Sequence, residues 1–241
     1  MCVENDIIQD GEGAQTLSAS RRRGKTFREI LLPAVVLVLW PFALYAASLS
    51  ASDTRPRIVA FGDSLTAGLG VQANESYPAQ LQRRLDDLEY PYRVINAGVS
   101  GDTTAGGLRR VPWILNNKPE LVILELGAND GLRGLDVDQV KHNLQRIIER
   151  LREAGATVIL AGMKLPPNYG QDYTTRFEAI YPALAQEYGL PLIPFFLAGV
   201  GGTSSLNQAD GIHPTKEGYE IIVEQVLKVL EPVLDKPLDI P

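Results

Sequence analysis

The chain has 241 residues, of which 45% are hydrophobic and 22% charged, a balance typical of a folded globular protein rather than a disordered or fibrous one. Its net charge of −6 lies entirely after position 50, because residues 1–50 carry five basic and five acidic side chains. The negative body disfavours nucleic acid and anionic membrane surfaces as partners.

The first 52 residues have the order of features found in an export signal. A basic cluster at 21–28 precedes an apolar stretch at 30–47, and small residues follow at 48–52. This order predicts a secretory signal peptide, with an uncleaved membrane anchor as the alternative. In either case we expect the rest of the chain, residues 53–241, to be exported as one domain, to the periplasm or the medium.

Short apolar runs alternate with longer amphipathic segments from Arg55 onward. The apolar runs predict strands at 57–61, 93–97, 121–126, 157–161 and 192–196. The amphipathic segments predict helices at 77–89, 103–117 (interrupted at Pro112), 138–154, 173–188 and 215–234. Strands that alternate with helices in this way indicate an α/β protein with a parallel sheet covered on both faces.

Few side chains of this body could hold a metal or act as a thiol. Cys2 is the single cysteine and lies before the apolar stretch, so the exported domain has no disulfide and no thiol nucleophile. The two histidines, His142 and His213, are too few for a histidine-rich metal site. We therefore expect no metal and no cofactor.

Polar clusters follow the predicted strands, at the edge where the carboxyl ends of parallel strands meet and where α/β proteins bind ligands. Their convergence on one edge is more informative than any single cluster. The four clusters are Asp63-Ser64, Ser100-Gly101-Asp102, Asn129-Asp130 and the pair Asp210/His213.

One of these clusters contains a candidate nucleophile. Ser64 needs a base to become reactive, and His213 is the natural one because His142 lies within a predicted helix. Asp210 could orient the imidazole and stabilise its charged form. The alternative is that Asp210 to Pro214 is simply the loop that begins the last helix.

Acyl transfer also needs donors for a developing oxyanion. The candidates are the backbone N–H groups of Ser64 and Gly101 and the side-chain amide of Asn129. Turn formation is the alternative role for Asn129 and its neighbour Asp130. For Asp63 and Thr66 we favour helix capping.

The chain resembles the SGNH (GDSL) hydrolases, and within them the thioesterase I, lysophospholipase and arylesterase group. Further similarity to this group extends over residues 125–134 and 165–170. The four family blocks occur in order, as Gly62–Leu65, Ser100–Thr103, Gly127–Asp130 and Asp210–His213.

The resemblance implies a three-layer α/β/α, flavodoxin-like fold with a five-stranded parallel sheet. It also implies a catalytic triad of Ser64, Asp210 and His213, and an oxyanion hole formed by Ser64, Gly101 and Asn129. The expected activity is hydrolysis of acyl and aryl esters, with lysophospholipase and acyl thioesterase activity, by a monomer.

Apolar side chains near the predicted site suit an acyl chain or an aryl group. We expect Leu132, Leu135, Tyr169 and Ile212 to contact the substrate. A carbohydrate O-acetylesterase is the first alternative, although it would need a more polar groove. A non-catalytic flavodoxin-like binding module is the second, but a phosphate-binding loop is absent after Gly62.

Overall fold

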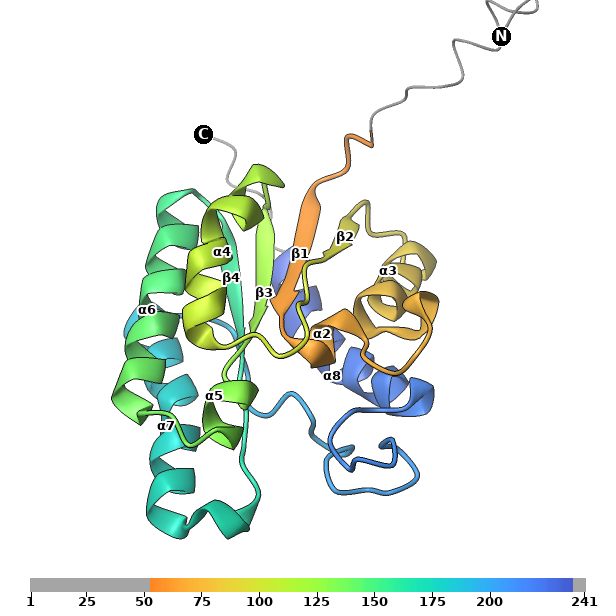
Figure 1. Ribbon diagram of the computed structural model, residues 1–241. Helices are drawn as coiled ribbons and strands as arrows, with labels where there is room; N and C mark the ends of the chain where they lie inside the picture. The colour runs from red at the N-terminus through yellow and green to blue at the C-terminus, as the bar shows by residue number, and fades with distance from the viewer. Residues whose placement is uncertain (1–52, 236–241) are drawn as a thin grey trace, which may run out of the picture. The chain divides into compact units, whose positions relative to one another are not determined.

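Five short parallel strands form the centre of the computed structural model, which describes residues 53–235 (Figure 1). The sheet order is β2-β1-β3-β4-β5, and every neighbouring pair is parallel. The predicted five-stranded parallel sheet is therefore confirmed. The strands are β1 (Arg57–Gly62), β2 (Arg93–Asn96), β3 (Leu121–Glu125), β4 (Thr157–Ala161) and β5 (Leu192–Ile193).

Helices cover both faces of this sheet, so the predicted three-layer α/β/α fold is also confirmed (Figure 1). One face is covered by α4 (Thr104–Asn116), α6 (Val137–Glu153) and α7 (Gln171–Tyr188). The other face is covered by α3 (Tyr77–Asp87) and α8 (Lys216–Leu234). The short helices are α2 (Ser64–Ala67), α5 (Ala128–Leu132) and the 3-10 turns η1 (Ala73–Glu75) and η2 (Pro167–Tyr169).

The core explains why the sequence forms these elements. All five residues of β3 are buried, as expected for a central strand that is covered on both faces. Helix α6 instead buries one stripe at helical spacing. This stripe consists of Val140, Leu144, Ile147, Ile148 and Leu151.

Helix α4 runs through Pro112 without the interruption that the sequence predicted. A proline inside a helix leaves the carbonyl four residues earlier without its usual N–H donor. Here that carbonyl belongs to Leu108, and the Arg150 guanidinium of α6 lies 3.5 Å from it. A donor from the neighbouring helix thus replaces the lost one, and the predicted break was wrong.

Strand β5 is shorter than the predicted run of residues 192–196 and ends at Ile193. Pro194 follows, and a proline has no N–H to donate to the strand ladder. The chain then keeps one contact with the segment after β4, because the Phe196 N–H donates to the Gly162 carbonyl at 2.8 Å.

The predicted export signal, residues 1–52, lies outside the described residues, and the domain boundary at 52/53 stays a prediction. No helix within residues 53–235 has both the length and the apolar character needed to cross a membrane.

The sheet order also determines where a site can form. In flavodoxin-like order, ligands bind at the carboxyl edge, where neighbouring connections leave in opposite directions. That point lies between β1 and β3 in this chain. Ser64 follows β1 after one residue and Asn129 follows β3 after three residues, so both lie at this edge.

Candidate active site

Ser64 is the first residue of α2, at the point where β1 turns into a helix. Asp63 caps this helix by accepting the Leu65 N–H at 3.0 Å. The turn places the Ser64 hydroxyl 2.8 Å from Nε2 of His213, 149 residues further along the chain. This distance suits proton transfer from a serine to a base.

The other ring nitrogen of His213 is held by Asp210, with Nδ1 and Oδ2 2.6 Å apart. Asp210 Oδ1 also accepts the backbone N–H groups of Ile212 at 2.9 Å and His213 at 3.0 Å. These bonds lower the pKa of Asp210 to about 2, so it carries a negative charge at neutral pH. The structure therefore brings the three predicted triad residues into one hydrogen-bonded chain.

Gln208 connects the His213 loop to the nucleophile side of the site. Its side-chain amide donates to the carbonyls of Leu69 at 2.7 Å and Pro214 at 3.0 Å, and its own N–H donates to the His213 carbonyl at 2.7 Å. Gln208 was not among the predicted site residues. Gln208 lies outside the four motif blocks, so the sequence alone gave no indication of this role.

The three predicted oxyanion donors line one cavity together with His213. Gly101 has a φ of +79°, a left-handed conformation that favours glycine. The amide of Asn129 donates one of its two N–H groups to Asp63 Oδ2 at 3.0 Å. Its second N–H remains to serve a substrate oxygen.

The capping prediction for residues 63 and 66 was right for Asp63 and wrong for Thr66. Asp63 caps α2, and it also orients Asn129. Thr66 is fully buried, and its hydroxyl donates to Glu125 Oε2 at 2.8 Å instead. Thr66 lies in the first turn of α2 but its hydroxyl bonds to Glu125 of β3. Spacing along the sequence could not indicate this contact.

Asp130 links two of the four blocks. It is 1% exposed, and its carboxylate accepts the backbone N–H of Thr104 at 2.8 Å and the Thr104 hydroxyl at 2.7 Å. Thr104 begins α4, directly after the loop that carries Gly101. Asp130 thus holds that loop against the block containing Asn129, a role more specific than turn formation.

The cavity at this site has a volume of about 730 Å³ and largely apolar walls. Leu132 and Ile212 line it, as expected, but Leu135 and Tyr169 are not among the residues of its wall. Leu135 is 41% exposed, and the Tyr169 hydroxyl donates to the Leu132 carbonyl at 3.0 Å. Tyr169 therefore contacts the last residue of α5, Leu132, which itself lines the cavity.

Several wall residues were not predicted from the sequence. They come from the loops that follow α2, β4 and β5. These loops lie at the same edge of the sheet as the catalytic blocks. Applying the carboxyl-edge rule to every strand would have indicated them. They include Leu69, Met163, Leu165, Phe195 and Leu197.

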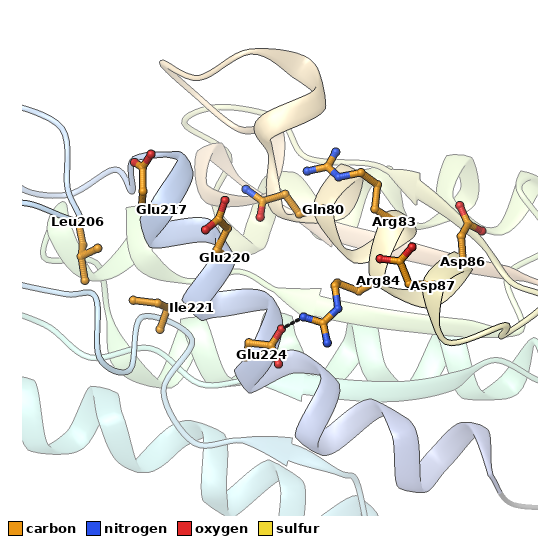
Figure 2. A pocket seen from close by; sticks show the side chains of 10 residues that line it. All are labelled: Gln80, Arg83, Arg84, Asp86, Asp87, Leu206, Glu217, Glu220, Ile221 and Glu224. Atoms are coloured by element: carbon orange, nitrogen blue, oxygen red, sulfur yellow. Dashed lines mark hydrogen bonds and ion pairs between the residues drawn. The ribbon is translucent and has the colours of Figure 1, made fainter.

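Two other features lie outside this site. His142 is exposed on α6 and does not line the cavity. A hollow of about 790 Å³ lies between α3 and α8, and Figure 2 shows its charged walls and the ion pair between Arg84 and Glu224. Although it is slightly larger, it contains none of the predicted site residues.

Comparison with known proteins agrees with this geometry. Residues 60–221 match the GDSL-like Lipase/Acylhydrolase family. The chain is 47% identical to Esterase TesA of Pseudomonas aeruginosa over 178 residues, 73% of this chain and 89% of that protein. It is 39% identical to Thioesterase 1/protease 1/lysophospholipase L1 of Escherichia coli K12 over 205 residues, 85% of this chain and 93% of that protein.

A solved structure shows the same fold. The psychrotrophic esterase EstA from Pseudoalteromonas sp., inhibited by monoethylphosphonate, superposes with a TM-score of 0.71 at 33% identity, over 75% of this chain and 99% of that one. The chain therefore belongs to the GDSL-like Lipase/Acylhydrolase family. The predicted family, and with it an acyl-ester hydrolase, is confirmed.

Proposed function

We propose that this protein hydrolyses esters through an acyl-enzyme formed on Ser64. The observation that carries the proposal is the hydrogen-bonded chain from Ser64 Oγ to His213 Nε2 (2.8 Å) and from His213 Nδ1 to Asp210 Oδ2 (2.6 Å). This is the arrangement of nucleophile, base and orienting carboxylate that acyl transfer requires. Inhibition of the related EstA by a phosphonate is consistent with such a nucleophile.

The first half-reaction would form the acyl-enzyme. Ser64 Oγ attacks the carbonyl carbon while His213 Nε2 takes the hydroxyl proton. The N–H groups of Ser64 and Gly101 and the amide of Asn129 stabilise the oxyanion. The imidazolium of His213 then gives its proton to the departing oxygen or sulfur.

The second half-reaction would regenerate the enzyme. Water attacks the acyl carbon, and its proton passes to His213. The tetrahedral intermediate then collapses, and Ser64 Oγ leaves as a hydroxyl with that proton. Asp210 stays ionised throughout and stabilises the charged imidazole.

The substrates we propose are acyl and aryl esters, acyl thioesters and lysophospholipids, hydrolysed by a monomer. The apolar cavity at Ser64 supports a hydrophobic acyl group, and the names of the relatives include esterase, thioesterase and lysophospholipase activities. The same apolar walls argue against a carbohydrate O-acetylesterase, whose acyl group carries no apolar tail.

The test is a series of p-nitrophenyl esters from acetyl to dodecanoyl. Because Leu132, Ile212 and Phe195 line the cavity, kcat/KM should rise with chain length until the cavity is filled. Each buried methylene contributes up to ~0.8 kcal/mol, or roughly fourfold. If kcat/KM for an acetylated xylan oligomer exceeds that for the octanoyl ester, the O-acetylesterase function replaces the one proposed.

We further propose that the protein is exported by its first 52 residues. The support is the order of basic, apolar and small residues at 21–28, 30–47 and 48–52. In a Gram-negative host, the mature protein should be recovered from the periplasm with a new N-terminus near residue 50. Recovery of activity in the cytoplasmic fraction with residues 1–52 retained would contradict export.

A further inference from the structure

A buried carboxyl group lies beneath the nucleophile. Glu125 is the last residue of β3 and pairs in register with Gly62 of β1. It is 0% exposed. Its Oε2 accepts the Thr66 hydroxyl at 2.8 Å and lies 3.5 Å from the backbone nitrogen of Asp63. Glu125 therefore contacts the turn on both sides of Ser64.

The surroundings of Glu125 favour its neutral form. No basic side chain within residues 53–235 forms an ion pair with it. Burial and the nearby charge of Asp63 raise the pKa of Glu125 well above its ordinary value. Burial also raises the pKa of Asp63, to about 6, but its carboxylate accepts the Leu65 N–H and an N–H of Asn129, so at pH 7 Asp63 is the charged member of the pair and Glu125 the neutral one.

The hydrogen bonds also indicate which oxygen carries the proton. With Oε2 accepting the Thr66 hydroxyl and facing the Asp63 N–H, we assign the proton to Oε1. Oε1 is buried and has no hydrogen-bond partner in the described part of the chain. The hydroxyl of Tyr219 is likewise buried without a partner. An unpaired neutral O–H is far less costly to bury than an unpaired charge.

The turn is built so that the carboxyl can approach it. A Cβ atom on Gly62 would lie 2.5 Å from Glu125 Oε2 and 2.1 Å from the Thr66 hydroxyl oxygen. These separations are shorter than any packed side chain tolerates, so glycine is required at this position. The contact between Glu125 and the turn depends on that missing side chain.

We propose that Glu125, as a neutral carboxylic acid, is a positioning residue for the nucleophile and the oxyanion hole. It fixes Thr66 and the backbone of Asp63, and Asp63 in turn holds Asn129. The inference rests on the proposed function, in which Ser64 is the nucleophile. Glu125 is buried behind the turn and acts through these neighbours.

Glutamine matches a neutral carboxylic acid in shape and offers a carbonyl acceptor and N–H donors, whereas leucine offers neither. Glu125→Gln should keep kcat within about threefold of wild type. Glu125→Leu should lower kcat by about 10- to 100-fold with little change in KM, since small misplacements of reacting groups cost about that much. Thr66→Val should lower kcat in the wild type and add little further loss in Glu125→Leu.

Two outcomes would overturn the proposal in these assays, run well below the melting temperature of each variant. If folded Glu125→Gln is inactive, the residue acts as a carboxylate. If Thr66→Val, or a folded Glu125→Leu, turns over like wild type, Glu125 has no positioning role. Because Glu125→Gln and Thr66→Val are nearly isosteric, the test stands even if the leucine variant fails to fold.

An infrared measurement tests whether the Glu125 carboxyl is neutral, and it does not depend on an activity assay. The difference spectrum of wild type minus Glu125→Gln at pH 7 should contain the carbonyl stretch of a protonated carboxyl. A carboxylate band in its place would overturn the neutral assignment. If Ser64→Ala shows that Ser64 is not the nucleophile, the proposed function fails, but this spectrum still reports on Glu125.

Discussion

Replacing Ser64 with alanine should lower hydrolysis of a p-nitrophenyl ester by about 10⁴-fold or more while the protein stays folded. The acyl-enzyme cannot form without Oγ, and the base 2.8 Å away then has no proton to accept. Ser64 is a small side chain at the start of α2 that lines the cavity, so the loss of its hydroxyl leaves the core unchanged. Circular dichroism and steady-state rates measure both parts of this expectation.

The two histidines provide a matched control for this result. His213→Ala should lose activity to a comparable degree. Residues of one catalytic unit act together, so removing any one of them removes most of the unit's contribution. His142→Ala should keep full activity, since His142 is exposed on α6 and away from the cavity. Retention of a tenth of wild-type activity by Ser64→Ala would exclude it as the nucleophile.

The next largest effect is expected for Asn129→Ala, which should lower kcat by about 10²- to 10³-fold with a smaller change in KM. One N–H of this amide is bound to Asp63, which fixes the orientation of the amide, and Asn129 lines the cavity. A donor held in this way acts mainly on the charge that develops in the transition state. Steady-state kinetics with an octanoyl ester would separate kcat from KM.

Asn168→Ala is a suitable control, because Asn168 is exposed in η2 and does not line the cavity. A rise in KM for Asn129→Ala with kcat intact would instead make the amide a substrate-binding group. The melting temperature should also be measured, since the substitution removes one of the donors to the buried Asp63 carboxylate.

The sequence was most informative where structure depends on local pattern. Buried parallel strands are short continuous apolar runs, so four of the five could be placed within a residue or two. Polar residues directly after those strands had to meet at one edge, so Ser64, Gly101 and Asn129 could be assigned to one site from the order of the elements alone. Asp210 and His213 could be assigned because the chain has only two histidines and the other, His142, lies within a predicted helix.

The features that were missed depend on partners far away in the sequence. Thr66 and Glu125 are 59 residues apart, and Gln208 and Leu69 are 139 apart. Glu125 ends an otherwise apolar strand, so its pattern gave no sign that a hydroxyl would reach it. The Leu108 carbonyl, which Pro112 leaves without its usual donor, accepts from Arg150 of another helix. Local spacing cannot reveal such contacts.

The close approach of Glu125 to Gly62 has a consequence for protein engineering. A designer who grafts the Gly-Asp-Ser-Leu segment onto another parallel sheet would transfer the serine but not what holds its turn. The neighbouring strand must end in an acid at the paired position, and that acid requires a residue without a side chain opposite it. The smallest transferable unit is therefore two adjacent strand ends, β1 with its turn and β3 with its terminal glutamate.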